Sequence, residues 1–452
     1  MKWLKWFGII IGVIVLILAA VPFLVSLNDY IPQIEKEISA RIREPVKIGG
    51  LRAAGLPLPH VTVDGITVGK TEDIKIGKVT VTPDLWSLLG ETKVIKSIEI
   101  DGLVLTQKAI DKIPAWTKPE PGKPVKSGEP APPPAVRVES ITLDDALVKL
   151  QKVSFGPFDA RLSLTSDGNP ESASIVTRDG KLKVFVKPDK SNYLIDASAK
   201  AWKLPVGPAI QFDELVVKGV ATLKDASLNE VRAKLYSGTV TGRLTAAWEK
   251  GIQLKGNFDV NQVELRNLVP LFSKDAKVSG RLNAKPVFSS SAKDAEQLAN
   301  ALRLETPFNV QNGVLYGVDL GKAASMIIGK EGTKGGETRF DQLSGHLVHD
   351  RGTSRFTQLI VASGSVSADG NVTISPRQEL SGRVNTKVTA GKLGTAGVPL
   401  NVSGTVQSPT LLPSGSALAG AAAGAVTGAG TAIGSSVGSF AGKLFGRKEE
   451  KK

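Results

Sequence analysis

Hydrophobic and polar residues alternate with a period of two along most of the chain, from about residue 50 to Pro409. Ile252 and Leu254, for example, alternate with Gln253 and Lys255. Because successive side chains of a β-strand point to opposite faces of its sheet, this pattern predicts many strands with one apolar face each. Helical spacing is confined to four short segments, at about residues 29–43, 83–89, 294–303 and 320–329.

These predicted helices are too short and too few to cover the apolar face of so large a sheet. Such a face must be buried against another layer or against a ligand. The sheet therefore either packs on itself as a sandwich or barrel, or curls into a trough whose lining contacts a ligand, and the pattern leaves both open. The candidate lining residues are Val79, Val81, Ile98, Ile100, Ile252, Leu254, Phe258, Val260, Val384 and Val388.

Turn signals divide the alternating segments. Asp-Gly or Asn-Gly pairs, which favour tight β-hairpins, occur at residues 167–168, 179–180, 312–313 and 369–370. Ser-Gly pairs recur beside the alternating runs but at irregular intervals, which argues against a strict solenoid repeat. We therefore expect a serially extended antiparallel meander.

The N-terminal segment predicts a membrane anchor. Phe7 to Val25 contains no charged residue and is long enough to cross about 30 Å of hydrocarbon as a helix. Lys2 and Lys5 precede it, so the positive-inside rule places the N-terminus in the cytoplasm and the rest of the chain outside. A cleaved signal peptide is the alternative, although the apolar run is longer than usual for one.

Composition shifts divide the chain further. Eight prolines fall within residues 114–134, a density that predicts an extended linker or loop. Small residues recur every fourth position in 415–442, and both a helix and disorder remain open for this tail. The expected organisation is an anchor (1–27), a helix plus β segment (28–112), a Pro-rich linker or loop (113–135), a middle β segment (136–234), a C-terminal β region (235–412) and a Gly/Ala-rich tail with a charged end (413–452).

The composition restricts the chemistry that is available. The chain has no Cys and only three His residues, which excludes thiolate nucleophiles and Cys-based zinc sites. The net charge of +14 favours anionic partners such as lipid headgroups. Aromatic residues make up only 5% and offer little for base stacking, so we expect no nucleic-acid partner.

Three local patterns resemble sites but lack the partners that the chemistry needs. His346 and His349 have no further His nearby, so strand residues are favoured over metal ligands. Ser290 and Lys293 match S-x-x-K without the accompanying motifs of that enzyme class. The glycine-rich segment 329–336 lacks the phosphate-binding spacing. We therefore expect no enzyme, no catalytic or metal-binding residue and no cofactor.

Several motifs follow one another in a fixed order along the chain. An uncharged anchor and an isoleucine-striped helix are followed by EPVKIGGLRA, and roughly 235–410 contains YSGTVTGRLTA, LKGNFDVNQVELRNLVPLF, VQNGVLYGVDL and ADGNVTISPRQELSGRVNTKV in that order. The first group resembles the N-terminal start, and the second the C-terminal region, of the AsmA family of Gram-negative envelopes. The resemblance implies a chorein-related, bridge-like fold, mainly β, with an N-terminal transmembrane helix and an elongated, curled antiparallel sheet that encloses an apolar groove.

The same resemblance implies a function without residue chemistry. The groove would bind the acyl chains of phospholipid or another acyl lipid and contribute to phospholipid transport and outer-membrane biogenesis. Expected partners are the inner membrane at the N-terminal helix and the outer membrane or a periplasmic protein at the C-terminal end. The alternative is a membrane-anchored periplasmic scaffold or assembly factor for outer-membrane proteins, with a dry, self-packed β body.

Overall fold

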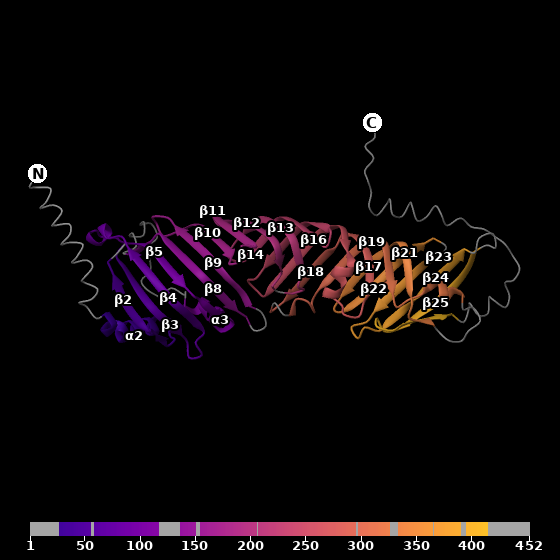
Figure 1. The fold of residues 1–452 in the computed structure, drawn as a ribbon, viewed down its shortest axis with the longest axis horizontal. Helices are drawn as coiled ribbons and strands as arrows, with labels where there is room; N and C mark the ends of the chain where they lie inside the picture. The colour runs from indigo at the N-terminus through magenta and orange to yellow at the C-terminus, as the bar shows by residue number, and fades with distance from the viewer. Residues whose placement is uncertain are drawn as a thin grey trace, which may run out of the picture. The chain divides into compact units, whose positions relative to one another are not determined.

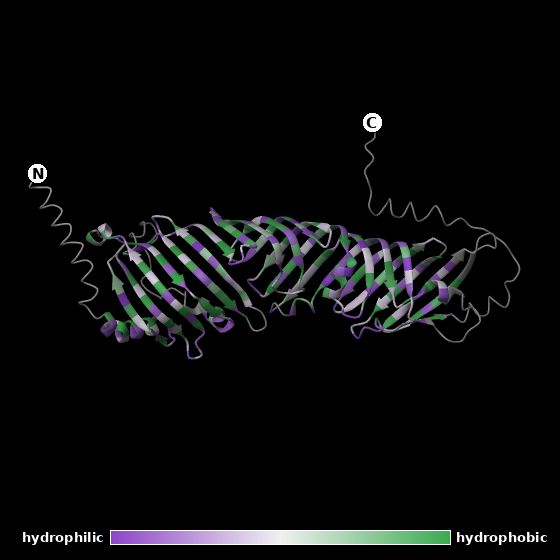
Figure 2. Cartoon of the chain, in the orientation of Figure 1, coloured by the Kyte–Doolittle hydropathy of each residue, from purple (hydrophilic) through white to green (hydrophobic). Residues whose placement is uncertain are grey.

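A computed structural model describes residues 27–55, 58–116, 136–150, 154–205, 207–294, 297–325, 333–364, 366–389 and 395–414. The chain divides into two compact units, Met1–Val206 and Gly207–Lys452. Both are mainly β, and hydrophobic and hydrophilic bands alternate along their strands in Figure 2. The expected mainly β class with a few short helices is confirmed.

The first unit begins with two helices and continues as a sheet (Figure 1). The helices of this unit are η1 (Leu27–Tyr30), α2 (Ile31–Ile42), η2 (Trp86–Leu89) and α3 (Gln107–Trp116). The strands are β1 (Val46–Lys47), β2 (Gly50–Ala54), β3 (His60–Val68), β4 (Ile74–Pro83), β5 (Lys93–Asp101), β6 (Val104–Thr106), β7 (Val136–Val138), β8 (Ser140–Lys149), β9 (Ser154–Leu164), β10 (Pro170–Thr177), β11 (Leu182–Asp189) and β12 (Asn192–Lys203).

Helix α2 begins and ends for local reasons. Pro32 occupies its first turn, and Arg43 ends it in the left-handed conformation at φ 60°. Two helix side chains then fix the next strand, because Ser39 Oγ accepts a hydrogen bond from Val46 N–H and Glu35 Oε1 accepts one from Ile48 N–H. The helix therefore lies against β1.

The predicted purely antiparallel meander is wrong at one place in the first unit. Strand β5 pairs in parallel with β7 and β8, and β6 pairs in parallel with β8. A parallel pair needs a long crossover connection. Here that connection carries α3, a helix that the sequence pattern did not predict. Its last residues, 113–116, fall within the expected Pro-rich linker, and residues 117–135 lie outside the described residues.

The second unit is also a sheet of strands in near-serial order. Its helices are α4 (Leu265–Leu268), η3 (Val269–Leu271) and α5 (Leu320–Ser325). Its strands are β13 (Gln211–Ala221), β14 (Asp225–Leu235), β15 (Gly238–Ala247), β16 (Ile252–Glu264), β17 (Val278–Ala284), β18 (Val287–Ala292), β19 (Arg303–Tyr316), β20 (Thr333–Lys334), β21 (Glu337–Asp350), β22 (Thr353–Ser363), β23 (Val366–Ile374), β24 (Leu380–Thr389), β25 (Thr395–Gly404) and β26 (Pro409–Pro413).

Helix α5 fills the apolar side of the second half of this unit. It contacts β21 and the four strands β23 to β26, and its Leu320 and Ala323 are almost completely buried. Strand β20, which follows α5 in the chain, pairs with the last strand through Thr333 and Leu411. The apolar face therefore has a packed protein core here.

Two predicted hairpin turns are confirmed and two are wrong. Residues 167–168 and 179–180 lie in the β9–β10 and β10–β11 turns. Asn312 and Gly313 instead lie inside β19, and Gly370 lies inside β23. Their glycines are needed for space: the ring of Phe340 lies where a Cβ of Gly313 would project. The expected helix at 294–303 forms turns over its described residues, with Arg303 already in β19.

The predicted anchor, Phe7–Val25, lies outside the described residues, as does nearly all of the Gly/Ala-rich tail. Among the helices that the structure describes, none combines the length and the apolar character that a membrane span requires.

Candidate functional site

Apolar side chains line up in continuous rows across the sheet of the first unit. Val79 pairs with Val63 on one side and with Ile100 on the other, and Ile100 pairs with Leu143. The neighbouring row runs through Val61, Val81, Ile98, Ile141, Leu162, Ala173, Val186 and Ile195. Paired residues share a face of the sheet, so the four lining residues predicted in this unit lie side by side in two adjacent rows.

These rows are only partly covered. Val79, Val81, Ile98 and Ile100 are half-buried. Of the residues opposite in phase, Lys78 and Glu99 are exposed, whereas Thr80, Thr82 and Ser97 are half-buried. The hydrophobic core cluster of the described chain consists entirely of residues from the second unit. In a packed sandwich both inner faces would interdigitate at interior density. The apolar rows of the first unit are half-buried and contribute no residue to that core cluster.

The predicted lining residues of strand β16 also share one face. Ile252, Leu254 and Phe258 are half-buried, whereas Gln253 and Lys255 between them are exposed. The strand pairs in register with β15 and β18, which extends the same alternation sideways. The period-two pattern therefore assigned the faces of this strand correctly.

Two of the predicted residues belong to a different environment. Val260 and Val384 pack against the buried core cluster, which includes Leu320 of α5 and Leu400 of β25. Leu400 is completely buried. Val388 pairs with Val366 on β23, and its side chain lies outside the described set. Protein side chains thus already occupy the apolar face around Val260 and Val384.

Aromatic rings covering glycines are a feature that the sequence reasoning missed. The rings of Phe258 and Phe288 stack with centroids 5.9 Å apart and an interplanar angle of 9°. Phe258 lies where a side chain of Gly242 would project, and Phe288 does the same for Gly256. The signal was available, because each glycine interrupts an alternating run at an apolar position.

Single-residue bulges keep the apolar side chains on one face along the long strands. In three strands one residue with positive φ is inserted, and its backbone N–H is bonded by a side-chain oxygen of the neighbouring strand. The apolar positions are then three apart instead of two, as at Val260 and Val263. The three pairs are Asp145 N–H to Asp159 Oδ1, Gln262 N–H to Asn283 Oδ1 and Gln358 N–H to Asn371 Oδ1.

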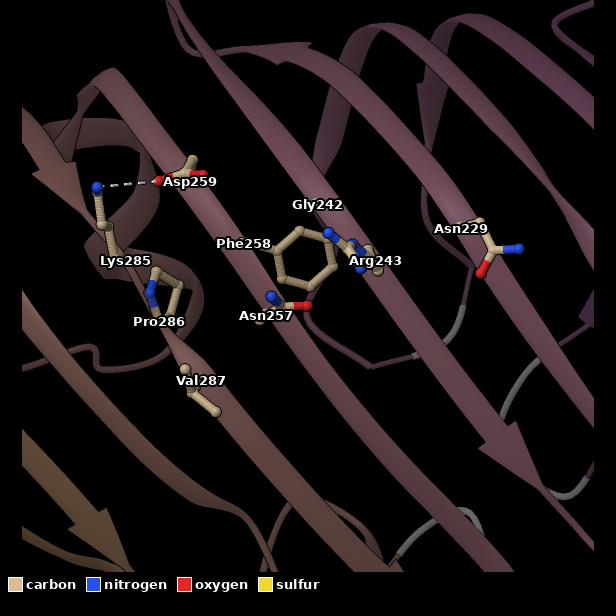
Figure 3. A pocket seen from close by; sticks show the side chains of 9 residues that line it. All are labelled: Asn229, Gly242, Arg243, Asn257, Phe258, Asp259, Lys285, Pro286 and Val287. Atoms are coloured by element: carbon tan, nitrogen blue, oxygen red, sulfur yellow. Dashed lines mark ion pairs between the residues drawn. The ribbon is translucent and has the colours of Figure 1, made fainter. Parts of the chain in front are cut away.

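The polar face of the second unit has a shallow hollow where β17 gives way to β18 (Figure 3). It measures about 320 Å³ and is lined by Asn229, Gly242, Arg243, Asn257, Asp259 and Lys285 together with Phe258, Pro286 and Val287. Asp259 and Lys285 form an ion pair at 3.9 Å. A wider hollow of about 950 Å³ shares Asn229, Arg243, Asn257 and Val287 with it. Amide and charged groups dominate the smaller hollow, so it suits water or a polar group better than an acyl chain.

The candidate catalytic residues are engaged in structural hydrogen bonds. Ser290 Oγ donates to Leu298 O at 2.6 Å. His346 Nε2 lies 3.0 Å from Glu305 Oε1. His349 Nδ1 lies 2.9 Å from Ser354 Oγ, and burial lowers the pKa of His349.

The two histidines also point away from each other. His346 pairs with Pro307 and His349 with Leu304, positions three apart and therefore on opposite faces of β21. The described residues hold no cluster of three or more His, Asp or Glu suited to a metal ion. Residues 329–332 of the glycine-rich segment lie outside the described residues, and Thr333 and Lys334 form strand β20.

One charged cluster at an edge of the first unit includes a buried carboxylate, that of Asp73. Lys112 Nζ of α3 lies 2.8 Å from Asp73 Oδ2 and 2.8 Å from Glu44 Oε1. Hydrogen bonds from Lys112 and Thr71 lower the pKa of Asp73, whose side chain is 3% exposed. The same contacts raise the pKa of Lys112. The cluster ties α3 to the beginning of β4.

Comparison with known proteins adds one match. The model of the AsmA family matches residues 186–359, from strand β11 of the first unit to strand β22 of the second. No curated protein and no solved structure matches the chain. The matched region contains strands β11 to β22, including β16 with its predicted lining residues.

Proposed function

We propose that this AsmA-family protein holds the acyl chains of phospholipid on the apolar face of its sheet and contributes to lipid transport in the cell envelope. The anchor predicted at Phe7–Val25 would hold it in the inner membrane, with the bulk of the chain in the periplasm. Lipid would leave or enter the face at the membranes or at a partner protein.

The observation that carries the proposal is that the half-buried apolar rows of the first unit contribute no residue to the core cluster, against which Val260 and Val384 pack. Ile98 and Ile100 retain access to solvent although each lies in a row of apolar neighbours. Transfer of an acyl chain from water to such a surface contributes roughly 0.8 kcal/mol per buried methylene. A phospholipid would be held by its tails, with its headgroup in water, and no catalytic group is required.

A second function is favoured by a different observation. The packed core around α5 occupies the apolar face in part of the second unit, and Val384 contributes to it. This is the arrangement expected of a dry scaffold for outer-membrane assembly. The two proposed functions differ in what contacts the apolar rows of the first unit: acyl chains in a lipid-binding protein, and protein in a scaffold. This difference can be measured.

The test is photo-crosslinking of the full-length protein in cells. A photoreactive phenylalanine analogue replaces Ile98 in one variant and Glu99 in the other. These neighbours on β5 face opposite sides of the sheet. We expect lipid adducts, identified by mass spectrometry, at position 98 and not at position 99. Equal labelling at the two positions, or no lipid at position 98 when the protein is folded and membrane-associated, would favour the scaffold.

A further inference from the structure

Large apolar side chains are exposed together at one edge of the first unit. Trp86 is 84% exposed and Leu89 is 87% exposed, both on the short helix η2. Leu58, Leu85 and Val136 are 62%, 44% and 53% exposed. We call these five residues the apolar edge.

The strand register places these residues at the same end of neighbouring strands. Leu58 precedes the first residue of β3, and Leu85 follows the last residue of β4. These two strand ends are adjacent, because Val61 of β3 pairs with Val81 of β4. Val136 pairs with Lys93 at the beginning of β5. The five side chains therefore come from adjacent turns and strand ends on one side of the sheet.

Several polar groups of the turn that presents Trp86 are paired close by. Asp84 Oδ1 accepts a hydrogen bond from Trp86 N–H at 3.2 Å, and the Asp84 carbonyl accepts from Ser87 Oγ at 2.7 Å. Ser87 Oγ in turn accepts from Val94 N–H, and the Ser87 carbonyl accepts from Gly90 N–H. An apolar medium tolerates backbone only when its donors and acceptors are paired. The groups named here are paired in this way, while the side chains of Trp86 and Leu89 are exposed.

The opposite edge of the same strands has a different character. Residues 69–73 connect the other ends of β3 and β4, and Asp73 there bonds Lys112. Lys70, Thr71 and Glu72 are all exposed. Large exposed apolar side chains are therefore found at one end of these strands, where Glu91 and Lys93 are also exposed, and not in the turn of residues 69–73 at the other end.

The course of the chain indicates what the apolar edge contacts. Val25, the last residue of the uncharged segment, precedes Leu27 of η1 by only two positions. Asn28 Oδ1 accepts a hydrogen bond from Leu51 N–H on β2, which fixes this entry point to the sheet. Leu51 is three residues from Ala54, the end of β2 beside the apolar edge, or about 10 Å at the strand rise.

We propose that the apolar edge docks on the surface of the lipid bilayer, with the side chains of Trp86 and Leu89 inserted among the acyl chains. Trp suits this position because it combines a large apolar ring with a polar N–H that stays near the headgroups. The inference deepens the proposed function and rests on its placement of the chain beside a membrane. Docking would bring the row that contains Val81 and Ile98 next to the lipid, because Val81 is two residues from the end of β4 at this edge.

The absence of Cys from the sequence makes a direct test possible. Leu89→Cys and Lys70→Cys, at opposite edges, each carry one environment-sensitive nitrobenzoxadiazole probe on the full chain. Both proteins are reconstituted into phosphatidylethanolamine and phosphatidylglycerol vesicles. These vesicles contain a phosphatidylcholine with a nitroxide on its acyl chain.

The probe at position 89 is expected to shift to the blue and to lose most of its emission to the nitroxide, whereas the probe at position 70 keeps its emission. A blue shift at position 89 without quenching would mean that protein covers the edge, and would overturn the proposal. Emission typical of water at position 89, or equal quenching at both positions, would also overturn it.

A second variant separates this inference from the proposed function. Trp86→Ser with Leu89→Ser removes the two inserting side chains at surface positions, where folding tolerates polar residues. Docking is then read from a probe at Leu58→Cys, and lipid binding from photo-crosslinking at position 98. We expect quenching at position 58 in the parent and its loss in the double variant. Unchanged quenching would overturn the role of Trp86 and Leu89. Lipid adducts at position 98 test the proposed function independently of either result.

Discussion

The ring of Phe288 covers the backbone of Gly256 on the adjacent strand, so that a Cβ built on Gly256 would lie 2.6 Å from Cε1 of the ring. The backbone of Gly256 is in ordinary extended conformation within β16, so glycine is required here for space and not for backbone freedom. The pairing also holds Phe288 in its stack with Phe258.

Gly256→Ala should therefore destabilise the second unit. The added methyl must displace the ring, and overpacking of this kind costs about 1–3 kcal/mol. Urea unfolding followed by circular dichroism measures the change. Gly321→Ala is the control, because a Cβ there meets only ordinary contacts at 3.5 Å and beyond, and its stability should stay within error or rise. Equal effects of the two changes would contradict the steric explanation.

A buried charge should distinguish the covered part of the apolar face from the uncovered part. Val384→Asp places a carboxylate against the core cluster and should cost several kcal/mol, enough to unfold the second unit. Ile98→Asp lies on the half-buried row of the first unit, where water reaches the carboxylate. We expect it to remain folded but to lose bound lipid. Thermal unfolding and lipid extraction of both variants give the comparison, and unfolding of Ile98→Asp would show that its row is dry.

The cluster of Asp73 and Lys112 predicts a specific pH dependence. The folded-state pKa of Asp73 is lowered, so its stabilisation is complete above the unfolded value of about 3.9 and is lost as the pH falls through the folded value. The pKa of Lys112 is raised, so its contribution is present below about 10.4 and is lost as the pH rises through its folded value.

Asp73→Asn should make the free energy of unfolding of the first unit depend less on pH below neutrality. It should also lower the denaturant concentration at the unfolding midpoint at neutral pH. Denaturant unfolding in steps from pH 7 to pH 3 measures both effects. Asp101→Asn serves as the control, because its ion pair with Lys78 at 3.6 Å is exposed and should contribute little. If the free energy of unfolding fell as steeply between pH 7 and pH 3 in Asp73→Asn as in the parent protein, the pH dependence would not come from Asp73.

The bulge at Gln262 predicts a role for Asn283. Asn283 Oδ1 accepts hydrogen bonds from both the backbone N–H and the Nε2 of Gln262, each at 3.1 Å. Asn283→Ala leaves the part-buried backbone N–H of Gln262 unpaired, while Gln262 Nε2 keeps its hydrogen bond to Gln311 Oε1, and should cost about 1–3 kcal/mol in the second unit. Asn401→Ala, an exposed position on β25, should cost less than about 0.5 kcal/mol. Hydrogen exchange of the Gln262 backbone amide reports the local effect. Unchanged protection of this amide in Asn283→Ala would argue against the proposed role of the Asn283 hydrogen bond.

Local patterning predicted much of the fold because it depends on strand geometry alone. Ile252 and Leu254 share one face and Gln253 and Lys255 the other, as a period of two requires. The same pattern failed at the bulges, where Val260 and Val263 face the same way three positions apart. The inserted residue takes positive φ, and its N–H is paired by a residue from another strand.

Long-range pairing decided the remaining features. Asp369-Gly370 has the local chemistry of a hairpin turn, yet Gly370 lies within β23, opposite Val384. The parallel pairing of β5 with β8 depends on a crossover that no local pattern specifies.

The sequence by itself determined that this protein is a series of strands with one apolar face, since alternation acts residue by residue. Only the tertiary structure decided what covers that face. Around Val384 the helix α5 returns to fill it, because Leu320 is brought there by strands distant in the chain. Around Ile98 the rows remain half-buried. Burial is a property of the assembled neighbours, so two valines or isoleucines with the same local pattern can line a packed core or an accessible surface.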